Sequence, residues 1–464
     1  MSPGLKEKKR LLFVAPPYFG HINQMIVLAR ELSDLGHQVG FASTELFRDR
    51  FKSTGIRFLR WEPEEAMTDA GLLKRRAGLW SAASRCSGIL RGERQMLSVV
   101  ADSYAAMYQT LTPIWRQLNP DLAVVDSAVV PAFDLARQHQ VPYIIQLQFL
   151  GNHAGIGAGY PRYGTDYSIR MTPWQRVLNL LHPLRVSIYF APAIARLNRA
   201  RARCGALTPV RQLYTKSLML VCSAYGIELP RPLPPLMKMV GPILPRQPDP
   251  LDASLGAWLA GGGSPVVYMS FGTLATLEAW QVQALVRGLN DPRWRVLWSL
   301  RPSQQEWVSA APPTFHIQAS VPQQAVLAHP AVRAFVSHCG MNSVSESLYW
   351  GKPILALPIF GDQHYNAARV ADVGAGLRLR KQRFDSNEVR RKMESLLDGP
   401  GYTAAARKMS NVLRQTGGLD EAARIVEHTL ASGFNHLIPE MLYATALTAS
   451  PERAPASNLL NRTT

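Results

Sequence analysis

The sequence predicts an α/β protein built from two doubly wound, parallel-sheet domains that face each other. The chain has 464 residues, of which 47% are hydrophobic, enough for two cores of ordinary domain size. Short apolar runs alternate with helical periodicity in both halves, the pattern of a parallel sheet covered by helices on both faces. A stretch with eight prolines, residues 229–250, separates the halves and suits an extended linker.

The first half contains several short apolar runs that predict strands. Residues 11–15 are the first expected strand, residues 16–21 a loop, and residues 23–35 a helix that ends at Gly36. Further strands are expected at residues 39–42, 122–125 and 143–146.

The second half repeats the alternation after the proline-rich stretch. Helices are expected at residues 277–289 and 342–350. Strands are expected at residues 266–271, 296–300, 316–319, 334–337 and 353–357.

The bulk composition bears on partners and compartment. The formal net charge is +18, but the basic residues are dispersed and no nucleic-acid-binding signature is present, so no nucleic-acid partner is expected. The same charge would allow weak peripheral contact with anionic membranes. Four scattered cysteines lack zinc-site spacing and fit a reducing cytoplasm. We expect no signal peptide and, without about 18 uninterrupted apolar residues, no spanning helix.

The densest motif runs from His338 to Glu346, where a strand leads into a helix. Helix N-termini present unpaired amides and a positive dipole end to anions, and Gly340 would allow a diphosphate to approach closely. His338, Asn342 and Ser343 can donate hydrogen bonds to phosphates. Glu346, one turn further, can accept from ribose hydroxyls. The alternative is a plain helix start, with Ser343 as N-cap and Glu346 as its capping-box partner.

The span 321–363 resembles the C-terminal signature of the family 1 UDP-dependent glycosyltransferases. The positions that match are Pro322, Gln323, Leu327, His329, Phe335, His338, Gly340, Ser343, Glu346, Gly351, Pro353, Pro358, Asp362 and Gln363. The resemblance implies a GT-B fold, two facing Rossmann-like domains with an interdomain cleft. It also implies an inverting mechanism in which the nucleotide sugar is a co-substrate, with no metal and no other cofactor.

The resemblance further implies how the donor is held. In that family the residues matching His338, Asn342 and Ser343 meet the phosphates, and the one matching Glu346 meets the ribose. Those matching Asp362 and Gln363 meet the sugar hydroxyls, as in glucose-using members, while Gln323 and Gln324 would line the nucleoside pocket. Gly272 and Thr273 resemble the loop beneath the diphosphate. Val321 stands where plant-type members stack a tryptophan on uracil, so a dTDP donor stays open beside the favoured UDP.

The catalytic candidates lie in the first half. Phe19-Gly20-His21 resembles the family's catalytic loop, and a histidine titrates in the range needed to take a proton from an alcohol. Asp126, which ends an apolar strand, is the expected partner of His21, because a carboxylate holds the imidazole tautomer and stabilises the imidazolium. Asp102 and Asp121 are rivals with less suitable positions.

The acceptor is expected to be a lipophilic small molecule, such as a natural product. Aromatic residues are frequent in residues 62–101 and 149–197, and Phe19, Trp80 and Phe149 are the acceptor-contacting candidates. The predicted activity is therefore transfer of glucose from UDP-glucose to an acceptor hydroxyl, with His21 as general base. The alternatives are a lipid-linked cell-envelope glycosyltransferase and a nucleotide-sugar-binding or regulatory module without catalysis.

The domain limits follow from these interpretations. Residues 1–232 are expected to form the acceptor-binding domain, 233–250 the linker, and 251–417 the nucleotide-sugar-binding domain. Residues 418–447 resemble the helices that cross back to the first domain in the family. Residues 448–464 are expected to be a mobile tail.

Overall fold

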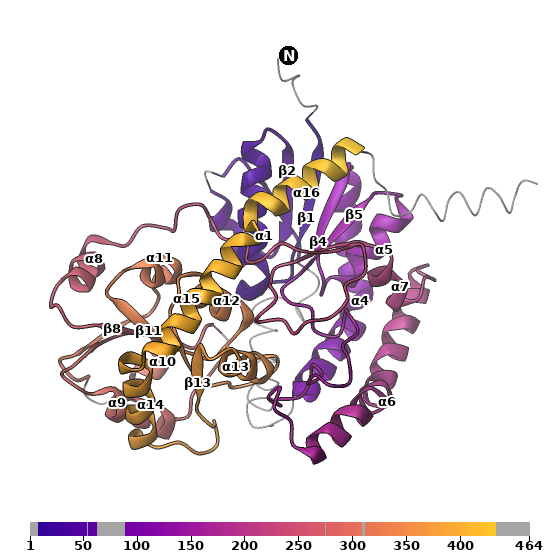
Figure 1. Cartoon of the computed structure of the whole chain (residues 1–464). Helices are drawn as coiled ribbons and strands as arrows, with labels where there is room; N and C mark the ends of the chain where they lie inside the picture. The colour runs from indigo at the N-terminus through magenta and orange to yellow at the C-terminus, as the bar shows by residue number, and fades with distance from the viewer. Residues whose placement is uncertain (1–7, 53, 63–88, 274, 309–310, 433–464) are drawn as a thin grey trace, which may run out of the picture.

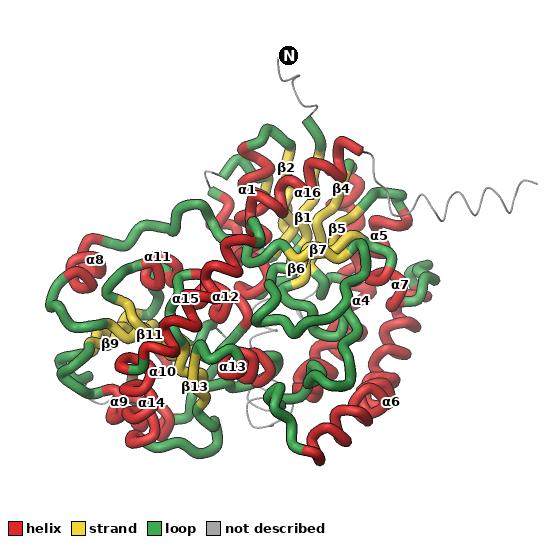
Figure 2. The backbone as a smooth tube through the Cα atoms, in the orientation of Figure 1, coloured by secondary structure: helices red, strands yellow, loops and turns green. Residues whose placement is uncertain are grey.

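Two all-parallel sheets form the framework of the protein (Figures 1 and 2). The computed structural model describes residues 8–52, 54–62, 89–273, 275–308 and 311–432. The first sheet has the order β3-β2-β1-β4-β5-β6-β7 and the second has the order β10-β9-β8-β11-β12-β13. The predicted class, two doubly wound α/β domains, is confirmed.

The strands are short and follow the apolar runs of the sequence. Those of the first sheet are β1 (Arg10–Val14), β2 (Gln38–Ser43), β3 (Arg57–Arg60), β4 (Leu122–Asp126), β5 (Tyr143–Leu147), β6 (Leu218–Val221) and β7 (Met237–Met239). Those of the second sheet are β8 (Val266–Ser270), β9 (Arg295–Ser299), β10 (Phe315–Gln318), β11 (Val332–Ser337), β12 (Ile354–Ala356) and β13 (Gly376–Arg378).

Helices cover both faces of each sheet (Figure 1). The first domain contains α1 (Phe19–Asp34), the 3-10 helix η1 (Glu45–Phe51), α4 (Ile89–Leu118), α5 (Val130–Gln138), α6 (Pro173–Arg203) and α7 (Val210–Thr215). The second half of the chain contains α8 (Ala253–Ala260), α9 (Ala279–Leu289), α10 (Pro302–Gln305), α11 (Gln323–Ala328), α12 (Met341–Tyr349), α13 (Gln363–Asp372), α14 (Ser386–Asp398), α15 (Pro400–Gln415) and α16 (Gly418–Ser432).

Strand β1 shows why the apolar runs are continuous rather than alternating. Leu11 and Phe13 pack into a core that includes residues of α1 and α16. Leu12 and Val14 point to the other face, into a core that includes residues of α4 and α5. In a sheet with one face exposed to water, every second residue of a strand can be polar. Both faces of this parallel sheet are covered, so the residues on both sides of the strand are apolar.

Both sheets reverse their strand order at one point, and these points position the site. The chain proceeds outward from β1 to β2 and β3, and then returns to place β4 on the other side of β1. The second sheet does the same around β8, with β9 on one side and β11 on the other. The loops after β1 and β4, and after β8 and β11, therefore diverge and leave room for ligands at the carboxyl ends of the strands.

Two expected boundaries are wrong. Helix α1 begins at Phe19, so Phe19 and His21 belong to its first turn and not to the loop. Tyr18 precedes the helix with an extended backbone and no side-chain cap, so the sequence carries no polar capping residue to mark the start. Strand β7 lies inside the expected linker 233–250 and pairs with β6 at the edge of the first sheet, in a proline-free interval.

Helix α6 bears on the expectation of no spanning helix, which rests on the absence of about 18 uninterrupted apolar residues. That absence holds, but a helix can also meet a requirement on length and average hydropathy alone. The length and composition of α6 meet that requirement, and only 17% of the apolar stretch is buried. The helix continues through Pro183 and Pro192, each of which removes one backbone hydrogen bond. These prolines and the interspersed arginines interrupt the apolar run in the sequence.

The C-terminal helices run from the second domain back to the first (Figure 1). Helix α15 packs against α12, and α16 packs against α1 in the core of the first domain. Between them Gly417 and Gly418 have positive φ angles of 87° and 52°, and the Gly418 amide donates to the carbonyl of Val240. Glycine adopts positive φ angles without steric cost. The chain can therefore turn beside Val240, where the segment that joins the first domain to the second lies against the segment that returns to the first domain. Residues 433–464, which include the remainder of the expected helices and tail, lie outside the described residues.

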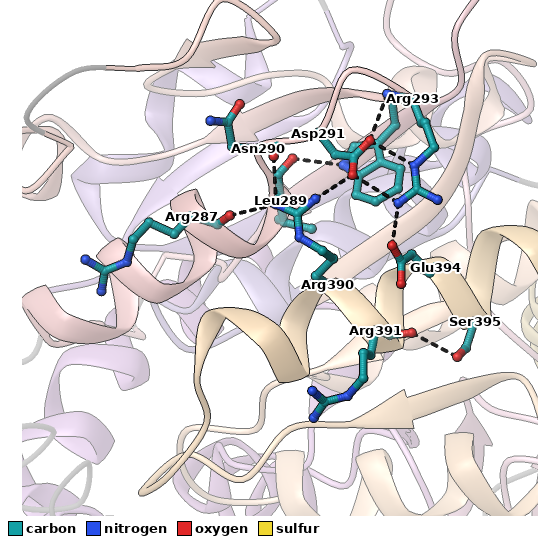
Figure 3. Close-up of polar contacts among 10 residues, drawn as sticks. Arg287, Leu289, Asn290, Asp291, Arg293, Arg390, Arg391, Glu394 and Ser395 are labelled. Atoms are coloured by element: carbon teal, nitrogen blue, oxygen red, sulfur yellow. Dashed lines mark hydrogen bonds and ion pairs between the residues drawn. The ribbon is translucent and has the colours of Figure 1, made fainter.

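A buried carboxylate ties the loop between α9 and β9 to α14 (Figure 3). Asp291 accepts hydrogen bonds from Arg293 Nε and Nη2 at 2.9 and 3.0 Å, and from Arg390 of α14. Arg293 in turn binds Glu394. The hydrogen bonds from Arg293 outweigh burial and lower the pKa of Asp291 to about 2.

We predict that Asp291→Asn lowers the free energy of unfolding at pH 7 by about 1–2 kcal/mol. The lowered pKa means that this stability is present above the ordinary aspartate pKa and is lost as the pH falls toward about 2. Urea titrations at pH 7, 5 and 3 should therefore show a difference that shrinks only at pH 3. Asp398→Asn, at an exposed position, is the control, and an equal loss there would contradict the assignment.

Candidate donor and catalytic site

The first switch point joins a histidine to a buried carboxylate. His21 lies in the first turn of α1, and its Nδ1 is 2.9 and 3.0 Å from the two carboxylate oxygens of Asp126 at the end of β4. Asp126 is fully buried and also accepts from the Ala128 amide at 2.9 Å. The rivals lie elsewhere: Asp121 binds Arg10, and Asp102 is exposed.

The Asp126 contact fixes which nitrogen of His21 is basic. A carboxylate only accepts hydrogen bonds, so Nδ1 carries the proton and Nε2 has the free lone pair. Burial alone would lower the pKa of His21, but the charge and hydrogen bond of Asp126, with a further contribution from Asp362, raise it above its ordinary value. Asp362 belongs to the second domain, so both domains set the basicity of this imidazole.

A chain of amide side chains joins the two domains beside His21. Asn342 in the first turn of α12 donates to the carbonyl of Gly20 and accepts from Gln24, each at 2.8 Å. Gln24 also donates to Gln148 at 3.1 Å. Neither Gln24 nor Gln148 forms part of a sequence motif, so neither could be predicted as a site residue. In this structure both ends of the Asn342 amide bind the first domain, and its contact with phosphate stays a prediction.

Helix α12 begins with an uncapped turn. Gly340 is the N-cap and gives no side-chain hydrogen bond, and Met341 is the first helical residue. Ser343 is therefore not the N-cap, and the capping-box alternative for Ser343 and Glu346 is wrong. The first amides of α12 and its positive dipole end remain as features suited to an anion.

A buried polar cluster lies one turn further along α12. Gln323 donates to Glu346 at 2.7 Å and lies 3.4 Å from the Ser343 hydroxyl. Tyr268 of β8, which the sequence analysis missed, donates to Gln323 at 3.1 Å. Burial raises the pKa of Glu346 to about 7, against the hydrogen bonds from Gln323 and Gln324. Val321 is partly buried against the apolar cluster behind this site.

Two glycines enclose His338 at the second switch point. A Cβ atom on Gly272 would lie 2.9 Å from the His338 ring, and one on Gly340 would lie 2.7 Å from its Nε2. Burial lowers the pKa of His338 to about 4, against a hydrogen bond to the backbone of Ser270. His338 is therefore neutral at pH 7. Thr273 is exposed in the same loop, where its carbonyl accepts from Arg301 at 3.3 Å.

Asp362 and Gln363 start α13 between this loop and His21. Asn366 donates to Asp362 at 2.6 Å and to the carbonyl of Cys339 at 3.0 Å, which holds the two segments together. Burial raises the pKa of Asp362, against Asn366 and the charge of His21. The Gln363 amide oxygen accepts from the backbone amides of residues 359 and 360, so this side chain is fixed in place.

An aromatic cluster bridges the domains on another side. Phe149 and Tyr365 of α13 flank Tyr163, with ring centroids 5.2 and 5.3 Å away. The Tyr163 hydroxyl donates to Glu93, whose pKa burial raises to about 7. Tyr163 lies within the aromatic-rich range 149–197, but neither its pairing with Glu93 nor Glu93 itself was predicted from the sequence. Phe19 instead packs on Phe47, and the predicted Trp80 lies outside the described residues.

Potential metal ligands do not gather in the described part of the chain. Among its His, Cys, Asp and Glu side chains, no group of three is placed to hold a metal ion.

Solved structures with the same architecture define the class of fold. A structure titled as the glycotransferase of kitacinnamycin matches with a TM-score of 0.67 at 20% identity, covering 91% of this chain and 99% of that one. A calicheamicin glycosyltransferase matches with a TM-score of 0.65 at 21% identity, covering 92% and 99%. The fold is that of the GT-B glycosyltransferases.

Sequence comparison identifies the family. The model described as "UDP-glucoronosyl and UDP-glucosyl transferase" matches residues 82–441, and the chain belongs to this family. A UDP-glycosyltransferase of Phaeomoniella chlamydospora is 29% identical over 342 residues, 70% of this chain and 71% of the relative. The human 2-hydroxyacylsphingosine 1-beta-galactosyltransferase is 26% identical over 436 residues, 89% and 78% of the two chains. This protein is a UDP-dependent glycosyltransferase.

We predict that Asp126→Asn lowers the pKa of His21, because the amide keeps a hydrogen-bond partner but removes the charge. Nitrogen-15 NMR titration of the histidine rings checks this, with His21→Ala identifying the signal. Asp121→Asn is the matched control, since Asp121 binds Arg10. An unchanged His21 pKa in Asp126→Asn would show that the contact does not set its basicity.

Proposed function

We propose that this enzyme transfers glucose from UDP-glucose to a hydroxyl of a lipophilic small molecule, with inversion and without a metal, and that His21 is the general base. The observation that carries the proposal is the contact of His21 Nδ1 with buried Asp126, opposite Asp362 of the second domain. This contact places a basic imidazole of the first domain beside Asp362 and the other residues of the second domain that are proposed to bind the sugar donor.

The proposed reaction is a single displacement. Nε2 of His21 takes the proton of the acceptor hydroxyl while its oxygen attacks the anomeric carbon of the sugar. The bond from that carbon to the diphosphate oxygen breaks, and UDP leaves with the electron pair. Attack opposite the leaving group inverts the anomeric configuration. Asp126 stabilises the imidazolium that forms, as a carboxylate does for a catalytic histidine.

The second domain offers groups to meet the charge on the leaving diphosphate. The first amides of α12, after Gly340, are suited to a phosphate, and the loop with Gly272 allows a close approach. His338 is neutral, so it would contribute a hydrogen bond and not a charge. Fixed donors of this kind stabilise developing negative charge without reorganisation, and on this basis we propose that no metal is needed.

Glucose is the proposed sugar because of Asp362 and Gln363. A carboxylate and a fixed amide at the start of α13 provide acceptor and donor groups for sugar hydroxyls, near the proposed base His21, whose pKa the charge of Asp362 helps to raise. UDP is favoured by the family. The pocket for uracil would lack an aromatic cover at Val321.

A lipophilic acceptor is proposed from the aromatic cluster of Phe149, Tyr163 and Tyr365. Tyr163 and Tyr365 are buried at the domain joint, next to Asp362, whose charge acts on Tyr163. These packed rings would provide an apolar wall for the acceptor beside the proposed sugar site. The human relative is named for a sphingolipid acceptor, and the solved structures are titled by natural products.

We predict that His21→Ala and Asp126→Asn lower kcat by about 10²–10⁴-fold while binding UDP-glucose as wild type does, because the base acts only in the transition state. The wild-type enzyme should add one hexose to members of a panel of phenolic, terpenoid and macrolide alcohols in EDTA, as detected by mass. Isothermal titration measures donor binding in the same buffers.

Controls separate the parts of this proposal. Asp102→Asn should leave kcat unchanged, because Asp102 is exposed and away from His21. Loss of all product in EDTA, with recovery on adding Mg²⁺, would contradict metal independence. Product only with dTDP-glucose would contradict the donor, and full activity of His21→Ala would contradict the base.

We predict that Glu346→Gln weakens UDP-glucose binding by about tenfold or more, because an ionised carboxylate accepts stronger hydrogen bonds from ribose hydroxyls than an amide does. The raised pKa of Glu346 adds a pH signature. The carboxylate is ionised above about pH 7, so wild-type affinity should rise from pH 6 to 8 and that of the variant should stay flat. UDP-glucose suits this titration because its diphosphate diester does not titrate in that range. Parallel pH profiles would contradict the role of Glu346.

A further inference from the structure

Helix α6 carries an apolar stripe on its solvent side. Along its first half the exposed large residues include Trp174, Val177, Leu181, Leu184 and Ile188, at intervals of three, four, three and four residues, and Leu180 beside them is 62% exposed. Trp174, Leu184 and Ile188 expose 68, 63 and 66% of their surface, values typical of residues with nothing packed on them. Exposed apolar patches of this kind mark interaction sites.

The other side of α6 is anchored to its own domain. Asn179, Ala193 and Leu197 are buried, and at the end of the helix buried Arg201 forms an ion pair with Asp134 at 2.7 Å. At 3.6 residues per turn these positions lie opposite the apolar stripe. A helix that crossed a bilayer would have to break the Arg201 ion pair and leave Asp134 buried and unpaired, which is costly. The geometry therefore suits a helix that lies on a surface.

The charges on α6 are of one sign. Its 31 residues include six arginines and no aspartate or glutamate. Arg176, Arg185, Arg199 and Arg203 are exposed, and Arg199 and Arg203 continue the line of the apolar stripe toward the C-terminal end. An apolar face bordered by arginines is complementary to the surface of a lipid bilayer, which has an apolar interior and anionic head groups.

The anchored side of α6 holds the loop that carries the aromatic cluster. Asn179 binds the backbone at residues 158, 160 and 162, and His182 binds the carbonyl of Tyr163 at 2.8 Å. Tyr163 packs on Phe149 and Tyr365 at the domain joint. One helix, about 10 Å thick, thus separates this cluster from the surface that bears the stripe. In Figure 1, α6 forms the outer edge of the first domain, on the side away from the second sheet.

We propose that the exposed face of α6 docks on an anionic lipid surface, with Trp174, Leu184 and Ile188 inserted at the level of the head groups and the arginines against lipid phosphates. The helix lies in the plane of the interface and keeps its contacts with the first domain. The docked enzyme presents its domain joint to apolar molecules dissolved in the lipid. The surface itself does not depend on which sugar is transferred.

Flotation with liposomes tests the proposal. Wild-type protein is mixed with vesicles of phosphatidylcholine alone or with 30% phosphatidylglycerol, at about 0.1 M salt. Binding to the anionic vesicles is expected, with about tenfold or greater loss in the double variant Leu184→Glu, Ile188→Glu. The matched control is Leu46→Glu, since Leu46 is 53% exposed on η1 outside this face. Circular dichroism melting confirms that all variants are folded.

Three outcomes would overturn the proposal. The first is absence of wild-type binding to anionic vesicles, and the second is an equal loss of binding in Leu46→Glu. The third is a wild-type dimer in light scattering that becomes monomeric in the double variant, which would mean that a second copy covers the face. Transfer to a water-soluble phenol should be unchanged in the double variant, so failure of docking is distinguishable from failure of the proposed activity.

Discussion

The buried carboxylate of Asp126 is the constraint on which the site depends. An uncompensated charge with no exposure to water is costly, so its oxygens must be bound. The sheet topology supplies the partner, because β1 and β4 are neighbours and the helix that follows β1 brings His21 to the end of β4. The same contact that satisfies Asp126 fixes the tautomer and direction of His21. The carbonyl of Gly20, one residue before, accepts a hydrogen bond from Asn342 and so brings the second domain close to His21.

Two histidines at this joint differ in charge because their surroundings differ. His21 has a carboxylate on Nδ1 and another across the joint, and both oppose the effect of burial on its pKa. His338 is enclosed by Gly272 and Gly340, and no carboxylate among the described residues opposes the effect of burial on its pKa. Burial therefore lowers the pKa of His338 to about 4. Pairs of groups whose environments push their pKa values apart are assigned different tasks. In the proposed displacement, His21 would serve as the basic ring on the acceptor side and His338 as a neutral hydrogen-bond donor on the diphosphate side.

Sequence patterns predicted the local parts of this site better than the contacts between them. The strands could be found because both faces of each sheet are buried, and Asp126 could be chosen over Asp121 because it ends a strand. The start of α1 could not be found, since no capping residue precedes Phe19. The partners of Asn342, the role of Tyr268 and the pairing of Tyr163 with Glu93 depend on which distant segments the topology brings together. Helix α6 was missed because prolines and arginines divide its apolar residues.

If α6 docks on lipid as proposed, the two substrates approach the site from different sides. The residues proposed for UDP lie on the second sheet and its helices, among polar side chains such as Gln323 and Glu346. The aromatic cluster lies at the joint, where Phe149 and Tyr163 of the first domain meet Tyr365 of α13. Helix α6 holds the Tyr163 loop from behind and turns an apolar and basic face outward. A charged, water-dissolved donor and an apolar acceptor then need not share an entrance, because a lipid surface at α6 would concentrate the acceptor on one side and leave the donor side in water. Exposed leucine and isoleucine side chains such as those of α6 are unfavourable in water alone. On this proposal they have the same purpose as the aromatic rings behind them, because both would provide apolar surface to an acceptor that moves from lipid toward His21.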